Sequence, residues 1–453
     1  MTARHKKKKL VVLGAGESGA GAAILAGKLG WDVFVSDFGS IAPKYKEMLD
    51  NHGIEWEEGH HTESRILDAD ECVKSPGIAP WVDIVRKLEA KNVPILSEIE
   101  FAGRFTDAKM VCITGSNGKT TTTMLIHHIL TSAGIDAGLA GNVGKSLALQ
   151  VAEDPHPVYV IELSSFQLEN MYRFKADVAV IMNITPDHMD RYDHKMENYV
   201  AAKFRILRNQ TKQDYFIYWN DDPVVREQIK HTQIEATRLP FSEFNEEGVH
   251  SYVDNGIIRF LTPTGNWEIP REKLSLPGPH NLYNSMAAGL SASVLNVRSE
   301  AICKALSDFS AVEHRLEFVA TVDGVRYIND SKATNVNSAW YALESMTSPT
   351  ILILGGKDKG NDYSEIEELV KQKVKAIVCL GADNKKIIDF FSGKVPVIAD
   401  THSISECVEK CRSLAKEGDC VLLSPCCASF DLFKSYEDRG CQFKDAVKAL
   451  YVK

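Results

Sequence analysis

Short apolar segments that suit β-strands alternate with helix-like segments along the chain, and this alternation limits the fold more than any other feature of the sequence. A first block contains LVVLG and WDVFVSD, a second opens at MVCITG and continues through VYVIEL and VAVIMNI, and a third runs from VRYIND to CVLLSP. Buried strands separated by helices predict parallel sheets with helices on their faces. Residues 251–270 are an exception, because their pattern suits antiparallel strands.

The chain is long enough for about three domains of roughly 150 residues each. Shifts in the strand and helix pattern place them at residues 1–96, 97–311 and 312–453. We therefore predict an α/β protein of three domains, each built on a sheet that is at least partly parallel.

The composition is that of an ordinary globular protein, with 44% hydrophobic and 25% charged residues. The formal net charge of −9 argues against a general nucleic-acid binder, because such proteins carry a basic excess that neutralises phosphates. No segment approaches the roughly 18 unbroken apolar residues of a membrane span, and Glu17 interrupts the apolar stretch that follows the lysines at 6–9. The ten cysteines form no CxxC pair, so we expect reduced thiols in a cytoplasmic protein.

A first glycine-rich turn, GAGESG at residues 14–19, follows a strand and opens a helix. Glycines allow a tight turn at such a place, and a phosphate can approach the backbone N–H groups. Asp37 ends the next strand, where a dinucleotide-binding fold carries an acid for the ribose. Alone, this turn predicts an NAD site. A turn that only packs a helix against a strand is the alternative, because a single GxGxxG motif is weakly specific.

A second glycine-rich turn, TGSNGKTT at residues 114–121, lies between the strand MVCI and the helix TMLIHHIL. Backbone donors can hold a polyphosphate there, Lys119 supplies a positive charge, and the Thr120 hydroxyl suits a magnesium ion. The usual GxxxxGK[ST] pattern would need glycine at Ile113, so the loop is a shortened variant. We expect a central domain like a P-loop ATPase, flanked by Rossmann-like domains at both ends of the chain.

Three chemically active side chains follow at the ends of later elements: Glu162 after VYVI, His188 in NITPDHMDRY and Lys203 in AAKFRIL. The carboxyl ends of parallel strands meet at one edge of a sheet, so these groups are candidate ligands or proton carriers near the nucleotide. Each has a structural alternative. A single histidine near a loop is more often structural, and a lysine on a helix is ordinarily a solvated charge.

Further motifs follow along nearly the whole chain: GSNGKTTT, ELSSFQLE, NITPDHMDRY, the lysine of AAK, LPGPHN, EHR, NDSKATN, GGKDKG and LLSPCCASFDLFKSYEDRG. In order and spacing they resemble the Mur ligase family. The motifs that the family shares imply an ATP-dependent amino-acid ligase. ELSSFQLE, NDSKATN and SPCCASFD are similar to the D-glutamate-adding members, and the DNPR signature of the diaminopimelate- or lysine-adding members is absent.

The resemblance implies that ATP drives the ligation of D-glutamate to UDP-N-acetylmuramoyl-L-alanine through an acyl phosphate, releasing ADP and phosphate. This is a step of peptidoglycan precursor synthesis, and thus of cell wall biogenesis, cell shape and cell division. By the same resemblance the three domains bind the UDP-sugar, the ATP and the amino acid in turn, and the first glycine turn receives UDP and not NAD. We expect a monomer that uses two magnesium ions.

The resemblance also assigns site residues. The catalytic residues are Lys119, Glu162, His188, Lys203 and Arg315. The residues expected to bind ATP are Gly115, Ser116, Asn117, Gly118, Lys119, Thr120, Thr121, Asn284, Arg315 and Asp330. The residues expected to bind the UDP-substrate are Gly16, Glu17, Ser18, Asp37, Ser75, Gly77 and Asn142. Those expected to bind D-glutamate are Lys332, Thr334, Lys359, Ser429 and Tyr436. One magnesium ion is assigned to Thr120 and Glu162, and a second to His188 and a carbamylated Lys203.

One departure from the family and three other functions stay open. Phe38 and Gly39 stand where the family carries a threonine and an arginine, so contacts to uracil or ribose are not carried over to them. An NAD-dependent oxidoreductase would explain only the first turn and leave Lys119 unused. A non-catalytic nucleotide-binding regulator would not require the pair of His188 and Lys203. Another Mur ligase or a folylpolyglutamate synthetase would share the chemistry but not all of the motifs.

Overall fold

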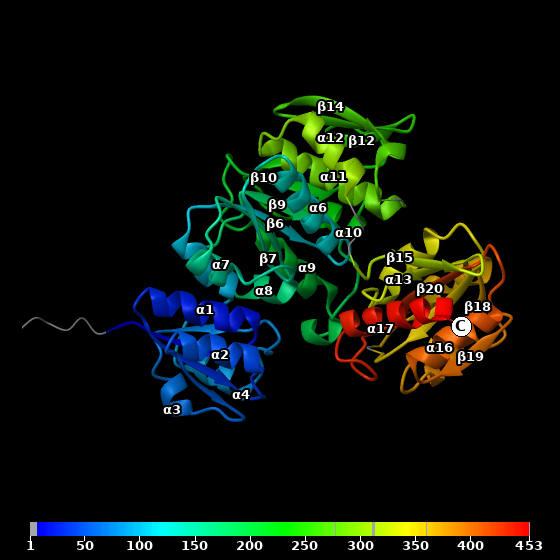
Figure 1. Ribbon diagram of the computed structural model, residues 1–453. Coiled ribbons are helices and arrows are strands. Elements are labelled where there is room, and N and C mark those ends of the chain that lie inside the picture. The colour runs from blue at the N-terminus through cyan, green and yellow to red at the C-terminus, as the bar shows by residue number, and fades with distance from the viewer. Residues whose placement is uncertain (1–6, 277, 310–312, 359, 453) are drawn as a thin grey trace, which may run out of the picture. The chain divides into compact units, whose positions relative to one another are not determined.

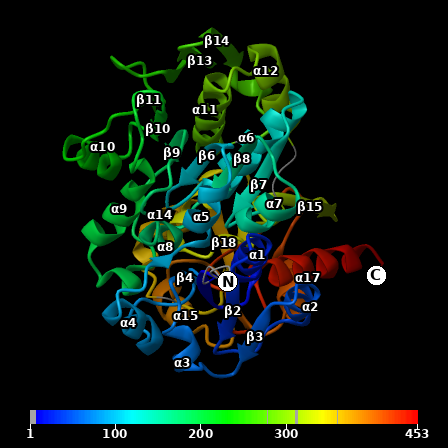
Figure 2. The same cartoon turned by 90° about the vertical axis from the view of Figure 1, so that its left-hand side faces the viewer.

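The computed structural model describes residues 7–276, 278–309, 313–358 and 360–452. Its strands form three sheets, one each in the N-terminal, central and C-terminal parts of the chain (Figures 1 and 2). The chain divides into two compact units, one of residues 1–274 with 283–308 and the other of residues 275–282 with 309–453. The first unit holds the first two sheets and the second unit holds the third. The predicted α/β fold with parallel sheets is confirmed.

The N-terminal sheet is entirely parallel and has the strand order β3-β2-β1-β4-β5. Its strands are β1 Lys9–Leu13, β2 Asp32–Asp37, β3 Glu55–Glu58, β4 Glu71–Lys74 and β5 Ile95–Leu96. The helices of this part are α1 Glu17–Lys28, α2 Pro43–Asn51, α3 Glu63–Ile66, α4 Asp83–Ala90 and α5 Glu98–Ala102. The order places β1, which the first glycine turn follows, at the centre of the sheet.

The central sheet has the strand order β14-β13-β12-β11-β10-β9-β6-β8-β7, with parallel pairs from β7 to β12. The predicted antiparallel stretch is confirmed in β12, β13 and β14. Its strands are β6 Lys109–Thr114, β7 Ala137–Gly141, β8 Val158–Glu162, β9 Val178–Ile181, β10 Tyr215–Trp219, β11 Thr237–Phe241, β12 Ser251–Asp254, β13 Ile257–Thr262 and β14 Gly265–Pro270. Its helices are α6 Lys119–Ser132, α7 Leu147–Glu153, α8 Ser165–Glu169, α9 Met196–Phe204, α10 Pro223–Lys230, α11 Pro279–Val294 and α12 Ser299–Asp308.

The C-terminal sheet has the strand order β15-β16-β20-β17-β18-β19 and is parallel except for the β15–β16 pair. Its strands are β15 Glu317–Val322, β16 Val325–Asn329, β17 Thr350–Gly355, β18 Val374–Leu380, β19 Ile398–Thr401 and β20 Cys420–Cys426. Its helices are α13 Val336–Glu344, α14 Glu367–Lys373, α15 Lys385–Phe391, α16 Ile404–Leu414 and α17 Tyr436–Ala449.

Helices cover both faces of the C-terminal sheet, as the apolar strand β17 requires. Successive side chains of a strand point to opposite faces. Leu352 and Leu354 pack in one hydrophobic cluster with residues of α13, α14 and α15. Ile351 and Ile353 pack in a second cluster with residues of α16 and α17. A strand that is buried on both faces has no polar alternation, which explains the unbroken apolar run in the sequence.

One hydrophobic core joins the first two sheets. It includes Leu10 and Val12 of β1 together with Cys112 of β6 and Ile161 of β8. Helix α1 lies beside α7 in both views (Figures 1 and 2). The two sheets therefore form a single compact unit, and contacts between their loops belong to one continuous structure.

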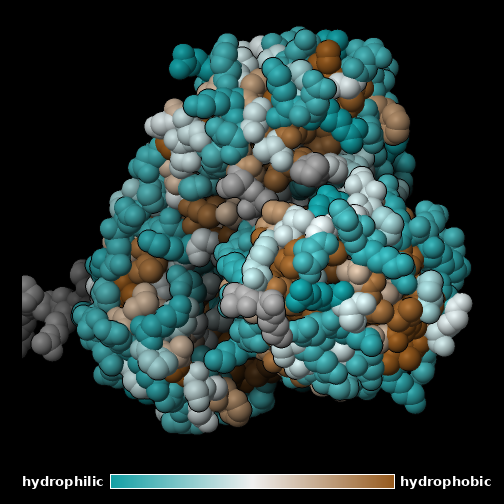
Figure 3. All heavy atoms as spheres, turned by 45° about the vertical axis from the view of Figure 1, so that its right-hand side comes forward, coloured by the Kyte–Doolittle hydropathy of each residue, from teal (hydrophilic) through white to brown (hydrophobic). Residues whose placement is uncertain are grey.

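Apolar side chains gather between the sheets and the helices that cover them, and the outer surface is more polar. On the face drawn in Figure 3, hydrophilic residues predominate and apolar residues form separate patches. Among the residues that the structure describes, no helix combines the length and the apolar character that a membrane crossing requires.

Candidate active site

The second glycine-rich turn, at residues 114–121 between β6 and α6, is called the phosphate loop after its predicted ligand. It depends on two glycines with positive φ. Gly115 has φ 147° and Gly118 has φ 81°, and L-residues with side chains rarely adopt these conformations. A Cβ added at Gly118 would lie 2.5 Å from Oδ1 of Asn284, and one at Gly115 would lie 3.1 Å from the carbonyl oxygen of Asn183. The close approach of Asn284 brings this predicted ATP ligand to the first turn of α6.

Asn183 holds the phosphate loop from the neighbouring strand. Its Oδ1 accepts the backbone N–H of Asn117 at 2.8 Å, and its Nδ2 donates to the carbonyl of Asn117 at 3.1 Å. The backbone N–H of Ser116 donates to the carbonyl of Asn183 at 2.8 Å. Sequence reasoning did not assign a role to Asn183. The available signal was its place directly after the apolar strand, as the first residue of NITPDHMDRY.

Two lysines converge on the same loop. Nζ of Lys119 donates to the carbonyls of Gly115 and Ser116, both at 2.8 Å. Nζ of Lys203, from α9, donates to the carbonyl of Gly115 at 2.7 Å and lies 4.5 Å from the centre of the Tyr199 ring. Burial lowers the pKa of Lys203 well below its usual range, and the positive charge of Lys119 lowers it further.

Glu162 lies at the carboxyl end of β8, next to the phosphate loop. The β6–β8 register pairs it with Ile113, and its side chain is buried. Nδ2 of Asn142 donates to Oε1 of Glu162 at 3.0 Å, and the backbone N–H of Asn142 donates to the carbonyl of Glu162 at 2.9 Å. A residue predicted to contact the UDP-substrate thus contacts a residue predicted to bind magnesium.

His188 has a left-handed backbone conformation, with φ 53°, directly before the 3₁₀ helix η2 Met189–Tyr192. Its ring meets the ring of Phe166 edge to face, with the centroids 5.0 Å apart. Its Nε2 lies 3.7 Å from Oδ2 of Asp187. The side chain is 37% exposed, so the imidazole stays accessible to a ligand.

The donors around the phosphate loop suit magnesium in part. The Thr120 hydroxyl lies in the first turn of α6, and the Glu162 carboxylate ends the adjacent strand; both offer the oxygen ligands that Mg²⁺ prefers. An ammonium group at Lys203 would repel a cation. The lowered pKa of Lys203 instead favours a neutral amine, which is the form that can attack carbon dioxide.

The first glycine turn is held together by residues that were predicted to bind the UDP-substrate. Oδ2 of Asp37 accepts the backbone N–H of Ala15 at 2.8 Å, and Oδ1 accepts that of Gly39 at 2.8 Å. The Ser75 hydroxyl donates to the carbonyl of Gly14 at 3.2 Å. Asp37 and Ser75 therefore shape the turn, whatever else they contact.

The surroundings of this turn differ from residue to residue. A Cβ added at Gly16 or Gly77 would meet nothing within 4 Å, so both backbones border open space. Ser18 lies in the first turn of α1. Oε2 of Glu17 accepts the hydroxyl of Tyr45 at 3.1 Å. Phe38 is 72% exposed and its ring centroid lies 5.6 Å from that of His61.

In the second unit, Asp330 is buried between two donors. Its Oδ1 accepts the backbone N–H of Leu316 at 3.2 Å, and its Oδ2 accepts the hydroxyl of Ser424 at 2.8 Å. Burial raises the pKa of Asp330 to about 7, against the opposing effect of the Arg315 charge. The structure thus places two of the predicted ATP ligands, Asp330 and Arg315, near each other.

One buried arginine, to which the sequence gave no role, binds the segments that carry two of the predicted D-glutamate ligands, Lys332 and Tyr436. Arg439 of α17 donates to the carbonyls of Ser331 and Cys427, at 2.8 and 3.2 Å. Ser331 precedes Lys332, and its hydroxyl donates to the carbonyl of Tyr436 at 2.8 Å. Nζ of Lys332 lies 5.2 Å from the centre of the Tyr436 ring. Arg439 therefore ties together the segments that carry these ligands.

Two further predicted D-glutamate ligands, Ser429 and Thr334, make backbone hydrogen bonds close to themselves in the chain. Ser429 is buried shortly after β20, and its carbonyl accepts the backbone N–H of Phe433 at 2.9 Å. The backbone N–H of Thr334 donates to the carbonyl of Lys332 at 2.9 Å. Lys359 lies outside the residues that the structure describes.

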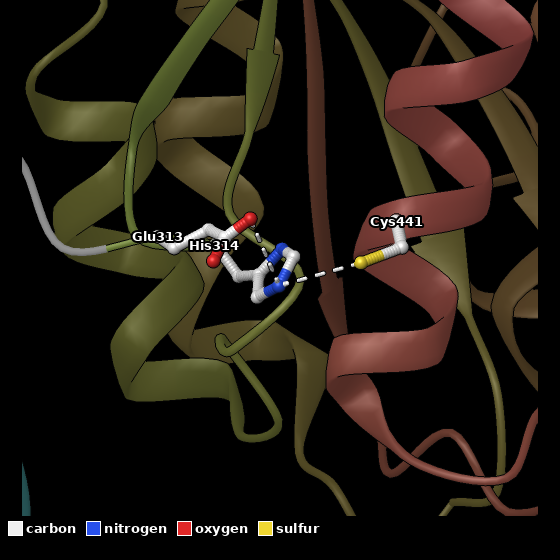
Figure 4. Close-up of side chains that lie close together, drawn as sticks. All are labelled: Glu313, His314 and Cys441. Atoms are coloured by element: carbon white, nitrogen blue, oxygen red, sulfur yellow. Dashed lines mark hydrogen bonds and ion pairs between the residues drawn. The ribbon is translucent and has the colours of Figure 1, made fainter.

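Among the described residues, one group of three side chains brings potential metal-binding atoms within 4.8 Å of one another: Glu313, His314 and Cys441 (Figure 4). Nδ2 of Asn329 donates to Nδ1 of His314 at 2.9 Å, while its carbonyl oxygen accepts a backbone N–H. This arrangement leaves the proton of the neutral imidazole on Nε2, the atom that faces Cys441 at 4.0 Å. Glu313 is paired with Lys444. The group therefore suits hydrogen bonding better than metal binding.

Three family models match the chain. The Mur ligase middle domain matches residues 113–292, the glutamate ligase domain of Mur ligases matches 314–427, and the MurD N-terminal domain matches 9–84. A UDP-N-acetylmuramoylalanine–D-glutamate ligase of Bacteroides fragilis is 61% identical over 444 residues, which cover 98% of this chain and 100% of the relative. A protein of the same name from Porphyromonas gingivalis is 56% identical over 443 residues, covering 97% of this chain and 98% of the relative.

Solved structures share the fold at low sequence identity. A pseudomurein peptide ligase type C from Methanothermus fervidus has a TM-score of 0.62 at 19% identity, with 98% of this chain and 100% of that chain covered. A UDP-N-acetylmuramate-alanine ligase from Thermotoga maritima has a TM-score of 0.62 at 18% identity, with the same coverage.

Proposed function

This chain belongs to the Mur ligase family, and from that premise we propose that it joins D-glutamate to UDP-N-acetylmuramoyl-L-alanine with the cleavage of ATP to ADP and phosphate. The observation that carries the proposal is the convergence of Lys119 and Lys203 on the Gly115 carbonyl, with Glu162 at the end of the adjacent strand. An NAD-dependent oxidoreductase would have no use for this arrangement.

The chemistry explains why a phosphate loop and an amino-acid site occur in one chain. A carboxylate is a poor electrophile, and its oxygen is a poor leaving group. Transfer of the γ-phosphoryl group of ATP to the L-alanine carboxylate gives an acyl phosphate. The amine of D-glutamate then attacks the acyl carbon, an amide bond forms, and phosphate leaves with the former carboxylate oxygen. Catalysis of such a transfer rests on positioning and on neutralising charge at the phosphoryl oxygens.

The residues of the phosphate loop have separate roles in this reaction. The backbone of residues 115–118 and the ammonium group of Lys119 bind the phosphates, and the Thr121 hydroxyl lies in the same first turn of α6. Asn284, beside Gly118, and Asp330 bind the adenosine part, and Arg315 binds the transferred phosphoryl group. Thr120, Glu162, His188 and Lys203 would hold two magnesium ions, which supply positive charge at the phosphoryl oxygens when bound.

Lys203 acts as a carbamate. Its buried amine loses its proton readily, so carbon dioxide can add to Nζ with loss of one proton. The product is an anion with two oxygen atoms at the place of a repelling ammonium group. The His188 imidazole, accessible on its own loop, also orients the incoming amine or removes its proton.

The UDP-substrate binds at the first glycine turn. Gly16 and Gly77 leave open space for the approach of a diphosphate to backbone N–H groups, and Glu17, Ser18, Asp37 and Ser75 line the same turn. Asn142 contacts the sugar or the peptide and keeps Glu162 in place through its side-chain hydrogen bond. A fixed separation between these groups brings the substrate carboxylate to the phosphoryl group.

D-Glutamate binds in the second unit, at Lys332, Thr334, Lys359, Ser429 and Tyr436. Two lysines there suit a dicarboxylate, because local charge in a cleft can oppose the net negative charge of the protein. The buried Arg439 keeps Lys332 and Tyr436 in register through Ser331. The enzyme acts as a monomer in the cytoplasm.

The test is product formation from purified components. Incubation with ATP, magnesium, UDP-N-acetylmuramoyl-L-alanine and D-glutamate should yield a new UDP-linked product whose mass rises by one glutamate less one water, together with one ADP for each amide formed. A matched reaction without D-glutamate should give no such product. ATP cleavage without amide formation would refute the proposed ligation.

A further inference from the structure

We propose that Arg191 is a positioning residue that links the loop expected to bind the UDP-substrate to the loop that carries His188. The inference rests on the proposed function and gives a role to a residue of NITPDHMDRY that was assigned none. Arg191 lies in η2, three residues after His188, and its side chain is only 8% exposed. Its NH1 donates to the carbonyl of Pro76 at 2.9 Å, and its NH2 lies 3.1 Å from Oε2 of Glu169.

The bond to Pro76 determines which way the next amide points. In a trans peptide the carbonyl and the following N–H point in opposite directions, so a Pro76 carbonyl turned toward Arg191 turns the Gly77 N–H away from it. Among the described residues the Gly77 N–H has no hydrogen-bond acceptor, and a Cβ at Gly77 would meet nothing within 4 Å. Arg191 thus holds a free N–H donor toward open space, as an anionic diphosphate requires.

A second buried cation supports the same loop. Nζ of Lys74 donates to the carbonyl of Ile78 at 2.7 Å. Burial, together with the neighbouring Arg191 charge, lowers the pKa of Lys74 to about 8. Glu169 and Glu89 are the nearby acids, and Glu169 also accepts the hydroxyl of Tyr192 at 2.7 Å. Lys74 and Arg191 thus hold two carbonyls of this loop, those of Ile78 and Pro76.

Arg191 also contacts an aromatic ring that in turn contacts His188. The guanidinium carbon lies 3.8 Å from the centre of the Phe166 ring, and the same ring meets the His188 ring at 5.0 Å. Nε of Arg191 is buried without a hydrogen-bond partner among the described residues, which costs free energy that a purely stabilising arginine would avoid. The side chain therefore connects the Gly77 amide to the imidazole through one aromatic ring.

Arg205 offers a matched control. Its Nε and NH2 donate to the carbonyls of Leu168 and Met171, at 2.7 and 2.8 Å, and its guanidinium lies 5.5 Å from the centre of the Tyr172 ring. Like Arg191 it is a partly buried arginine that bonds backbone carbonyls and lies over an aromatic ring. Of the two carbonyls that Arg205 binds, one lies in the last turn of α8 and the other two residues after it, so Arg205 has no hydrogen bond to the loop at residues 75–78.

The experiment compares Arg191→Lys, Phe166→Leu and Arg205→Lys by two measurements. The first is the dissociation constant of UDP-N-acetylmuramoyl-L-alanine from the full-length protein, by calorimetry without ATP or magnesium. The second is the magnesium concentration that half-saturates ligation. Lysine cannot make the two-donor fork of arginine, so Arg191→Lys should raise both values by about 10-fold. Phe166→Leu should raise only the magnesium requirement, and Arg205→Lys should change neither, although all three lower the melting temperature.

Equal effects of Arg191→Lys and Arg205→Lys on the dissociation constant would overturn the inference. If Arg191→Lys fails to fold, Glu169→Gln removes the charge that holds Arg191 and should shift both measurements in the same direction; no shift would also overturn the inference. Ligation by the unaltered protein is the control that tests the proposed function by itself. Absence of ligation in the unaltered protein refutes the function, whereas normal ligation with unshifted Arg191→Lys constants refutes only the role of Arg191.

Discussion

At the scale of single residues, two ammonium groups share one carbonyl oxygen, that of Gly115. Like charges this close raise the free energy of the doubly protonated state, and burial raises it further for Lys203. One of the two lysines therefore keeps its charge for phosphate and the other tends to give up its proton. Their positions in the sequence are 84 residues apart, so only the fold reveals that they act on one another.

Lys119→Ala should remove a contact that strengthens as charge moves in the transition state. Losses of this kind lower the rate by roughly 100- to 1,000-fold. The measurement is kcat for ADP release with all substrates saturating. Lys230→Ala, which removes an exposed lysine paired with Glu227 on α10, is the control and should keep full activity. Near-normal activity of a folded Lys119→Ala variant would show that Lys119 does not bind the phosphates.

Lys203→Ala should be nearly inactive, because it removes the proposed carbamate and leaves a cavity beside the phosphate loop. A small carboxylate such as acetate or propionate can occupy that cavity, so partial rescue is expected on its addition. Lys203→Arg should not be rescued, since its guanidinium fills the space and keeps its charge. If the activity of Lys203→Ala is the same with and without added carboxylate, the result would count against the carbamate.

At the scale of elements, the junction between α5 and α7 carries a buried acid. Oε1 of Glu98, at the start of α5, accepts the hydroxyl of Ser146 at 2.7 Å and the backbone N–H of Ala148 at 2.6 Å, which caps α7. Burial raises the pKa of Glu98 to about 7 from an ordinary value of 4.5. The folded state thus binds more protons than the unfolded state between these two pH values.

The stability contributed by this protonation is complete below about pH 4.5 and falls as the pH rises through 7. The difference between the two pKa values corresponds to about 3 kcal/mol at most. Glu98→Gln cannot ionise, so its free energy of unfolding, measured in urea from pH 5 to pH 8, should decline less steeply than that of the unaltered protein. Parallel pH profiles for the two proteins would contradict the raised pKa.

Elements with strong apolar runs were predictable from the sequence, and weak edge strands were not. The strands β1, β2, β6, β8 and β17 follow directly from buried apolar segments. Strand β3 reads EWEE and β7 reads AGLAG, and neither shows the apolar run or the strict alternation of a strand. Both lie at sheet edges, where partners in the sheet supply the order that the local sequence lacks.

The candidate site was also predictable only in part. The phosphate loop and the residues after strand ends were indicated by motif and position. Asn183, Arg191 and Arg439 lie within quoted motifs, but their roles were not indicated, because each acts by donating to or accepting from backbone groups of a distant segment. Any polar side chain can make such bonds, so their roles depend on which backbone the fold brings near and leave no signature of their own in the sequence.

At the scale of the whole molecule, one reaction requires three different substrates, and the residues assigned to them occupy all three sheets. The central sheet carries the phosphate loop, the N-terminal sheet carries the first glycine turn, and the C-terminal sheet carries the residues proposed to bind the amino acid. The cleavage of ATP explains the residues of the central sheet but not those of the other two sheets. Amino-acid specificity is therefore the property that distinguishes this ligase from other enzymes that cleave ATP.

The most direct test of the account is amino-acid-dependent ADP release, measured side by side with D-glutamate, L-glutamate, D-glutamine, L-alanine and meso-diaminopimelate at saturating ATP and UDP-N-acetylmuramoyl-L-alanine. A charged hydrogen bond lost from a binding site costs about 1.5–3 kcal/mol, which corresponds to about a 10- to 150-fold loss of affinity. D-Glutamate should therefore give the highest kcat/KM, and D-glutamine, which lacks the second carboxylate, should fall below it by at least about 10-fold. A preference for any of the other four amino acids would contradict the assignment.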